Sequence, residues 1–176
     1  MTNKAKSKRT KKTYDIDGYC FRTKPIYDLY CELKEAKKEG LVNRFELPDI
    51  KTTASSKYKA QKCQINGHHF DSVMEGRFYF HLLREKKNKR VKYIELQPEF
   101  TLQEGFSKNG KKIRPIKYRA DFLVTYPKNE KVVYDVKGKK TPEFALKQKI
   151  FDYRFPDLKL ECVKYTVKKG WHCIDR

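Results

Sequence analysis

Two aspartates and a lysine are the residues of this chain whose types and spacing could do chemistry. Asp121 lies in the segment 119–126 (RADFLVTY), and Asp135 and Lys137 lie in the segment 131–137 (KVVYDVK). Both segments are rich in aromatic and β-branched residues and the intervening residues 127–130 are typical of turns, so the pattern predicts a β-hairpin. If the numbers of facing residues sum to about 257, Asp121 lies beside Asp135, at the roughly 5 Å typical of facing Cβ atoms. Asp135 and Lys137 then share one face, because side chains alternate along a strand.

This pair of carboxylates predicts a metal site. Two carboxylates that close repel each other unless a cation lies between them, and oxygen ligands suit a hard divalent ion such as Mg²⁺. The alternative is a hairpin with a solvated polar face, in which Asp135 and Lys137 form a surface ion pair worth less than about 1 kcal/mol.

The charge of the chain predicts a polyanionic partner. The 176 residues include 42 Lys and Arg against 22 Asp and Glu, a net charge of +20. No apolar run approaches the roughly 18 residues needed to span a membrane, and no signal-peptide pattern is present, so nucleic acid is favoured over a membrane surface. Five cysteines without a C-x-x-C spacing indicate reduced thiols in a cytoplasmic compartment: Cys20, Cys31, Cys63, Cys162 and Cys173.

An internal duplication accounts for much of the N-terminal half. Residues 16–49 align with residues 65–98, and ten of the 34 positions are identical, where average composition would give about two or three. Each copy has the pattern of a hairpin around an Asp-Gly or Asn-Gly turn, followed by a helix and a strand. Because Glu75 in the second copy aligns with Ile26 in the first, we interpret the first copy as a degenerate scaffold or binding unit. We expect it to serve DNA binding or dimerisation.

Glu75 has two competing interpretations. Ser72 and Glu75 have the spacing of a capping box, with Ser as N-cap and Glu three residues later. Alternatively Glu75, on the first turn of its helix, reaches Asp121 and Asp135 as a third carboxylate. One side chain cannot do both at once.

After the second helix the pattern predicts three strands, a helix and a strand. Thr141 as N-cap and Pro142 at the next position begin the later helix, and residues 158–165 form the last strand. The last strand can return beside its predecessors through that helix. We therefore expect an α/β (α+β-like) fold with an αβββαβ core and an N-terminal degenerate repeat of the hairpin-helix-strand unit. The predicted parts are a basic disordered tail (1–13), the first copy (14–50), a polar linker (51–57), the core (58–165) and a C-terminal tail (166–176).

Several motifs occur in one order over about residues 57–163: INGHHFDSxxE, ELQPEF, IKYRADF, DVKG, TPEF and YRFPDL. Together they resemble a phage-associated family of small PD-(D/E)xK nucleases, similar in layout to Holliday-junction resolvase-like and transposase-end-cleaving enzymes. In that pattern an acid on one strand, here Asp121, precedes an acid-x-Lys triplet on the next, here 135–137. Ala120 stands where the pattern has proline, which contributes no metal ligand.

The resemblance implies a restriction-endonuclease-like core and a Mg²⁺-dependent DNA endonuclease in which Mn²⁺ can substitute. Glu75, Asp121, Asp135 and the carbonyl of Val136 would hold one or two ions, and Lys137 would stabilise charge on phosphorus or orient a water. The resemblance favours the metal-ligand role of Glu75. It also implies a phage protein in the bacterial host cytoplasm, acting on duplex or branched DNA in recombination, replication or processing. A resolvase would require a homodimer.

Basic side chains flank the proposed acidic centre in residues 86–92, 108–119 and 137–140, and we expect them to form a phosphate track. Gln97 and Lys147 are second-tier candidates for positioning phosphate or water, with a strand-end amide and a solvated lysine as the alternatives. His68 and His69 fit turn positions better than a catalytic base, and Trp171 fits core packing better than base stacking. The candidate nucleic-acid-binding residues are Lys111, Lys112, Arg114, Lys117, Arg119, Lys139, Lys140 and Lys147.

Two other classes of function compete with the nuclease. One is a non-catalytic, basic nucleic-acid-binding protein in which the hairpin acids are structural. The other is a phage protein that binds an acidic host protein.

Overall fold

The computed structural model describes residues 13–21, 23–48 and 61–174. The predicted linker (51–57) lies outside the described residues, as does the predicted basic tail except for its last residue. The chain divides into two compact units, Met1–Arg77 and Phe78–Arg176. The division therefore falls within a helix of the second copy and not in the predicted linker.

The first unit consists of two hairpins, a helix and the start of a second helix. A tight turn at Asp17-Gly18 and another at Asn66-Gly67 place all four residues at positive φ, between 51° and 82°, the backbone that Asp-Gly and Asn-Gly hairpins require. A short strand after the first helix, Phe45–Glu46, pairs antiparallel with the first strand of the second hairpin, with Phe45 opposite Ile65. The elements are β1 (Tyr14–Ile16), β2 (Tyr19–Phe21), α1 (Lys24–Lys38), β3 (Phe45–Glu46), β4 (Cys63–Ile65), β5 (His68–Phe70) and the first residues of α2 (Val73–Lys87).

The predicted duplication is present in the structure. β4, β5 and α2 each begin 49 residues after β1, β2 and α1, and each has the same length as its counterpart. The copies differ at one contact between strand and helix. In the first copy the rings of Tyr14 and Tyr27 pack with centroids 5.8 Å apart. The equivalent residues of the second copy are Cys63 and Gly76, so two small residues replace two aromatic ones at this contact.

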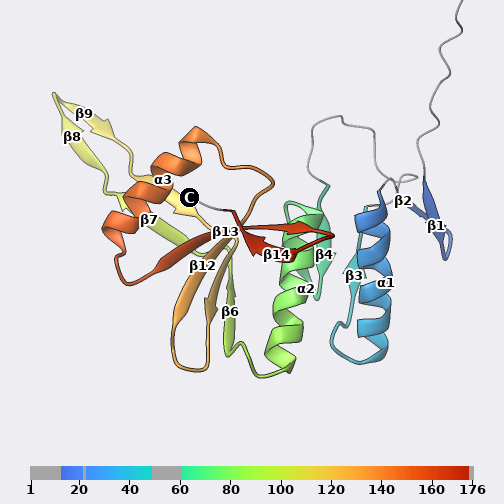
Figure 1. The fold of residues 1–176 in the computed structure, drawn as a ribbon. Helices are drawn as coiled ribbons and strands as arrows, with labels where there is room; N and C mark the ends of the chain where they lie inside the picture. The colour runs from blue at the N-terminus through green and yellow to red at the C-terminus, as the bar shows by residue number, and fades with distance from the viewer. Residues whose placement is uncertain (1–12, 22, 49–60, 175–176) are drawn as a thin grey trace, which may run out of the picture. The chain divides into compact units, whose positions relative to one another are not determined.

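The second unit is built on a five-stranded mixed sheet in the order β14-β13-β12-β11-β6 (Figure 1). β6, β11 and β12 are antiparallel neighbours. β12 and β13 are parallel, and α3 connects them. The elements are β6 (Tyr93–Leu96), β7 (Glu99–Gln103), β8 (Phe106–Lys108), β9 (Lys111–Ile113), β10 (Ile116–Arg119), β11 (Phe122–Thr125), β12 (Lys131–Val136), α3 (Pro142–Arg154), β13 (Lys159–Thr166) and β14 (Gly170–Cys173).

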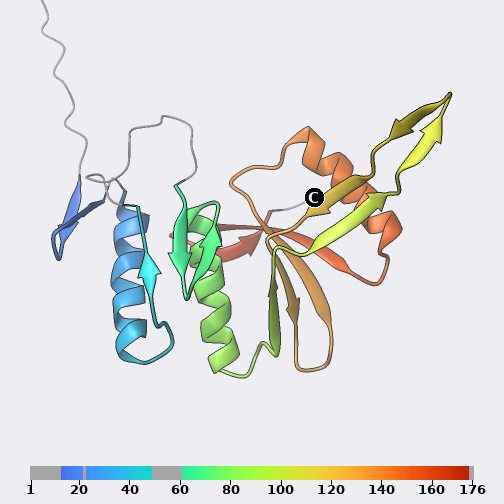
Figure 2. The same cartoon turned by 180° about the vertical axis from the view of Figure 1, so that it is seen from behind.

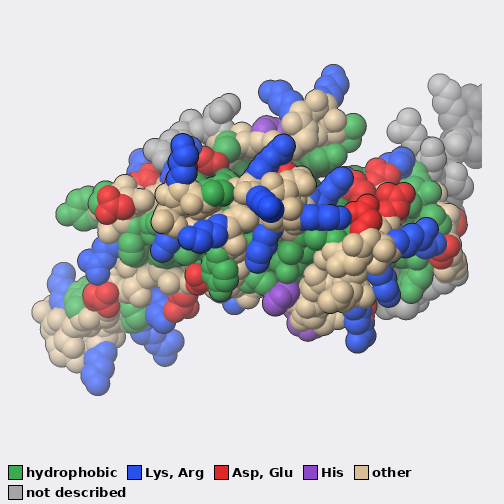
Figure 3. Space-filling model, turned by 90° about the horizontal axis from the view of Figure 1, so that it is seen from below, with side chains coloured by type: hydrophobic (Ala, Val, Ile, Leu, Met, Phe, Trp, Pro, Cys, Tyr) green, Lys and Arg blue, Asp and Glu red, His purple; other side chains and the backbone are tan. Residues whose placement is uncertain are grey.

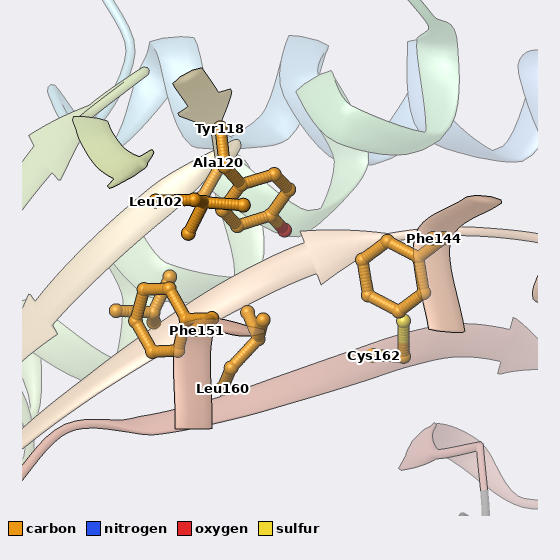
Figure 4. Packing of buried hydrophobic residues seen from close by; sticks show 8 residues of the cluster. Leu102, Tyr118, Ala120, Phe144, Phe151, Leu160 and Cys162 are labelled. Atoms are coloured by element: carbon orange, nitrogen blue, oxygen red, sulfur yellow. The ribbon is translucent and has the colours of Figure 1, made fainter. Parts of the chain in front are cut away.

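Helical residues pack on both faces of this sheet. On one face, Phe78 of α2 contacts the rings of Phe122 and Tyr134, with centroids 5.4 and 5.3 Å away. On the other face, α3 contributes to a buried cluster that also receives side chains from β7, β10, β12 and β13 (Figure 4). Its members are Leu102, Tyr118, Ala120, Val133, Phe144, Phe151, Leu160 and Cys162. The mixed α/β class agrees with the prediction, but the chain forms seven strands between α2 and α3, of which β6, β11 and β12 belong to the five-stranded sheet.

The first predicted strand of this core is bent into two. Gln97 has φ 51°, a left-handed value that is rare for a residue of this type, and Pro98 has no N–H to continue the ladder. β6 therefore stays in the main sheet, while β7 pairs with β10 in a separate two-stranded sheet. From these strands β8 and β9 continue as a hairpin that projects from the rest of the unit, as both ribbon views show (Figures 1 and 2).

The C-terminal segment, predicted as a tail, contains β14, which pairs antiparallel with β13. Trp171 lies in β14 and packs on Phe78, with ring centroids 4.8 Å apart, so the core-packing interpretation of Trp171 is confirmed. A short run of Gly170 and an aromatic residue carries little periodicity, which is why the strand was missed. Among the described residues no helix is long and apolar enough to cross a membrane.

The contact between Cys63 and Gly76 gives a test of the second copy's packing. A Cβ added at Gly76 would lie 2.4 Å from Sγ of Cys63. We expect Gly76→Ala to lower the free energy of unfolding by about 1–3 kcal/mol through overpacking. This loss is larger than the stabilisation that the higher helix propensity of alanine provides. In a Cys63→Ala background the same substitution should become neutral or stabilising by up to about 1 kcal/mol. Urea denaturation of the four chains measures both effects, and an equal cost in the two backgrounds would contradict this account.

Candidate functional site

A pocket of about 230 Å³ opens beside the C-terminal end of β12, on the face of the sheet that α3 covers. Its walls combine basic side chains with one buried carboxylate. The lining residues are Lys117, Tyr118, Arg119, Asp135, Lys137, Thr141, Glu143, Phe144 and Lys147.

Asp135 is the buried carboxylate of this pocket, with 2% of its surface exposed. Its Oδ2 accepts a hydrogen bond of 2.5 Å from the hydroxyl of Tyr118. Its Oδ1 lies 2.7 Å from Nζ of Lys137, but the angles of that ion pair are not those of a hydrogen bond, and Oδ1 accepts none among the described residues. One oxygen of Asp135 is therefore fixed by a donor, while the other has only its contact with a cation.

The carboxylate of Asp121 lies next to the strand that carries Asp135. In the β11–β12 ladder facing numbers sum to 256 and not 257, and the ladder ends at the pair of Phe122 and Tyr134, one residue before Asp121. Asp121 N donates to Tyr134 O at 3.1 Å. Its Oδ2 accepts a hydrogen bond of 2.6 Å from the backbone N–H of Val136, which ties the carboxylate to the strand that carries Asp135.

Lys137 completes the cluster as a permanent cation. Burial alone would lower its pKa, but the contact with Asp135 and the negative charges of Asp135 and Asp121 outweigh burial and raise the pKa above its usual value. Nζ also lies 4.9 Å from the centroid of the Phe144 ring, a distance at which the ring attracts a cation. The surroundings of Lys137 thus favour its charged, ammonium form.

Tyr118 is a site residue that the sequence analysis missed. Burial, the charge of Asp135 and the hydrogen bond to it raise the pKa of Tyr118 well above its usual value, so the hydroxyl stays protonated and remains a donor. The strand pattern alone gives no reason to pair Tyr118 with Asp135. The chain leaves the regular ladder between β10 and β11, and this break brings both Tyr118 and Asp121 to the same carboxylate.

Glu75 lies in the first unit, and its carboxylate forms the predicted capping box. Oε1 accepts from the hydroxyl of Ser72 at 2.8 Å and Oε2 from the N–H of Asp71 at 3.0 Å, while Glu75 N donates to Ser72 Oγ at 3.1 Å. Burial raises the pKa of Glu75 despite these hydrogen bonds. Its role as a third metal ligand stays a prediction, and that role would require the carboxylate to leave both contacts.

The predicted nucleic-acid-binding residues fall into three places. Lys117, Arg119 and Lys147 line the pocket. Lys111, Lys112 and Arg114 lie on or next to the projecting β9 strand, and Lys139 and Lys140 follow β12. Lys and Arg side chains are spread widely over the face of the molecule in Figure 3.

The two second-tier candidates both lie close to the cluster. Lys147 lines the pocket and pairs with Glu143 one turn earlier in α3, at 2.7 Å. Gln97 N donates to the carbonyl of Asp121 at 2.9 Å. Its left-handed backbone, at the bend between β6 and β7, is a conformation that often marks functional positions. His68 and His69 lie in β5 of the first unit.

Asp135 in the pocket wall and the neighbouring Asp121 fit a magnesium ion. Asp121 does not line the pocket, but its carboxylate is bound to the N–H of Val136, the residue after Asp135, and Oδ1 of Asp135 is a buried oxygen without an aligned donor. Magnesium is commonly held by one or two carboxylates together with waters and substrate phosphate oxygens. Among the described residues no group of three or more His, Cys, Asp or Glu side chains could hold a metal ion, so the fit is to a two-carboxylate site.

A second pocket, of about 200 Å³, lies on the opposite face of the sheet, where Phe78 and Trp171 line it. It includes Glu85 and Glu161 and no lysine or arginine. Phosphate would be repelled there, so the pocket at Asp135 is the better candidate for a phosphate-containing substrate.

Fold and site together define a mixed α/β protein with a buried aspartate–lysine pair, a neighbouring aspartate and a basic pocket wall. The chain belongs to the family described as "Protein of unknown function (DUF1064)", whose family model matches residues 55–169. No curated protein and no solved structure matches the chain.

The hydrogen bond from Tyr118 to Asp135 predicts a measurable stability effect. Tyr118→Phe leaves a buried carboxylate oxygen without its donor, so we expect the free energy of unfolding to fall by about 1–3 kcal/mol. The matched control is Tyr126→Phe, which removes a hydroxyl from the partly buried pair of Tyr126 and Tyr134 and should cost about 0.5–1.5 kcal/mol. Urea denaturation compares them, and a smaller loss for Tyr118→Phe than for Tyr126→Phe would contradict the role given to Tyr118.

Proposed function

We propose that this protein is a metal-dependent endonuclease that hydrolyses phosphodiester bonds in DNA. One observation carries the proposal: Asp121, Asp135 and Lys137 meet at the end of one hairpin, at a pocket whose other polar walls are largely basic. A carboxylate pair with an adjacent ammonium suits the hydrolysis of a phosphodiester, because it can hold a divalent cation next to a group that stabilises negative charge.

The element order supports a finer proposal about the fold. Helix α2, strands β6, β11 and β12, helix α3 and the parallel strand β13 follow the αβββαβ order of a restriction-endonuclease-like core. The positions of the acids support this proposal: Asp121 immediately precedes β11, and Asp135 is the last residue but one of β12. We therefore propose a core of this type for the second unit together with α2.

Each residue of the cluster has a role in the proposed reaction. Tyr118 holds Oδ2 of Asp135, so that Oδ1 points toward Lys137. The N–H of Val136 orients the carboxylate of Asp121 through its Oδ2, and this carboxylate would be the second metal ligand. Lys137, as a permanent cation, binds a phosphate oxygen and stabilises the charge that grows on it. Lys117, Arg119 and Lys147 bind neighbouring phosphates along the pocket wall.

Asp121 and Asp135 would hold the Mg²⁺ ion, which would supply a Lewis acid for the phosphate and would lower the pKa of a water bound to it.

A non-catalytic nucleic-acid-binding protein is the second candidate. The observation that favours it is the capping box, in which both oxygens of Glu75 already accept hydrogen bonds. In this alternative the basic side chains bind phosphates, while Asp135 and Lys137 serve only as a buried ion pair.

The proposal predicts DNA cleavage that depends on a divalent cation and on Asp135. Supercoiled and branched DNA should be cut in Mg²⁺ or Mn²⁺ but not in EDTA. Asp135→Asn, which keeps an acceptor for Tyr118, should lower the rate by at least about 100-fold, and Lys137→Arg should retain more activity than Lys137→Met. Gel electrophoresis of the DNA measures cleavage.

The matched controls are Asp157→Asn and Lys149→Met, which make the same changes at exposed positions of the second unit and should leave the rate unchanged. Thermal unfolding of each variant identifies a loss of fold. DNA binding without cleavage by the wild-type chain in either metal ion would overturn the nuclease and leave the binding protein.

A further inference from the structure

The hairpin formed by β8 and β9, with the residues that flank it, is an exposed arm, here residues 104–117. All fourteen of these residues are exposed. The two strands pair only with each other, with Phe106 opposite Ile113 and Lys108 opposite Lys111. Both ribbon views show the arm projecting from the sheet (Figures 1 and 2). A two-stranded hairpin with no packing of its own is marginally stable in water, so the arm is suited to a partner that packs around it.

Five of the six charged residues of the arm are cations. Its one acidic residue, Glu104, pairs with Arg154 of α3 at 3.2 Å, and Lys117 pairs with Glu99 at 2.6 Å. The other four cations make no ion pair within the described part of the chain: Lys108, Lys111, Lys112 and Arg114.

The tip has an arrangement that costs stability in the free chain. Lys108 and Lys111 are directly opposite each other, and like charges at facing positions destabilise a strand pair. A polyanion would relieve this repulsion. An acidic protein would also be attracted, but regularly spaced phosphates would match cations that lie on both faces of the ribbon, because Lys112 lies on the face opposite to Lys111.

Apolar side chains accompany these charges. Phe106 and Ile113 form a facing pair that is 47% and 41% exposed, on the same ribbon face as Lys108 and Lys111. Apolar groups in a DNA-binding element contact base edges, such as the methyl group of thymine in the major groove, whereas cations contact the phosphates.

The width and length of the arm match the major groove of B-DNA better than the other grooves of duplex nucleic acids. Paired strands lie about 4.8 Å apart, and the B-DNA major groove, about 12 Å wide and about 8.5 Å deep, admits a two-stranded ribbon. Four residues of strand between the base and tip of the arm span about 13 Å, which is enough to reach the groove floor. The minor groove of B-DNA is about 6 Å wide, and the major groove of A-form RNA is too narrow for protein side chains to read.

We propose that this arm lies in the major groove of duplex DNA and holds the duplex against the pocket-bearing unit. The inference rests on the DNA substrate of the proposed function but not on hydrolysis. It identifies the substrate as duplex, B-form DNA at the position of the arm, with the branched or scissile region elsewhere on the same molecule.

The test compares two triple variants with equal loss of charge. The arm variant replaces Lys108, Lys111 and Lys112 by Gln, and the control replaces the exposed Lys128, Lys168 and Lys169 by Gln. Fluorescence anisotropy in EDTA measures binding of the full chain to duplex DNA and to duplex RNA of the same sequence, over a range of salt concentrations. A further duplex DNA carries bulky 5-substituted pyrimidines, which fill the major groove.

The arm variant should bind duplex DNA about 10- to 100-fold more weakly than the wild type, and its log–log salt slope should be smaller by about 2–3, at about 0.9 per lost phosphate contact. The control variant and the RNA duplex should show much smaller differences. The 5-substituted duplex should weaken binding of the wild type but not of the arm variant. Thermal unfolding should not be lowered, because all the substituted residues are exposed and the arm variant also loses the repulsion between Lys108 and Lys111.

Equal losses for the two triple variants, equal losses on DNA and RNA, or indifference to the 5-substituents would overturn the groove assignment. The binding assay is done in EDTA, so those results do not decide whether the chain cleaves DNA in Mg²⁺. A wild-type chain that binds no DNA would overturn both proposals, while groove binding without cleavage in Mg²⁺ would overturn only the nuclease.

Discussion

The buried carboxylate of Asp135 is the constraint on which the candidate site depends. A carboxylate that is 2% exposed must be held by donors and cations, since an isolated buried charge is very costly. Tyr118 donates a hydrogen bond to one oxygen of Asp135, and the ammonium group of Lys137 lies next to the other. Burial and the charge of Asp135 together raise the pKa of Tyr118, and the charges of Asp135 and Asp121 raise the pKa of Lys137 despite its burial. The same contacts that allow the strand to bury an acid also prepare a pocket with a fixed cation.

A comparison of the two copies distinguishes the features of the shared folding unit from those found in only one copy. Both copies retain the hairpin, its left-handed turn and a helix of equal length, so these features belong to the folding unit. The differences lie at the helix start, where one copy packs Tyr14 on Tyr27 and the other has Cys63 beside Gly76. The capping glutamate also occurs only in the second copy, where Ile26 is its counterpart. The first residues of α2, the helix that leads into the main sheet, therefore differ from those of α1.

Much of the hairpin could be predicted from sequence, because alternation and turn residues determine a local ladder. The neighbouring aspartates and the side of Lys137 follow from a period of two and one turn position. Three features could not be predicted in this way. The bend at Gln97, the contact of Tyr118 with Asp135 and the strand β14 all depend on tertiary packing or on a break in periodicity. Glu75 shows a further limit, since one spacing fits both a helix cap and a metal ligand.

The bend at Gln97 and Pro98 has a mechanical consequence. The strands that enter the main sheet, β6 and β11, are covalently continuous with β7 and β10, which carry the cationic hairpin. Hydrogen bonds at the bend join Gln97 to Asp121 and Ala120 to Pro98. Asp121 therefore lies at one end of a continuous stretch of backbone whose other end is the hairpin tip. Any load on that tip is transmitted along the backbone to the residues that orient the two carboxylates.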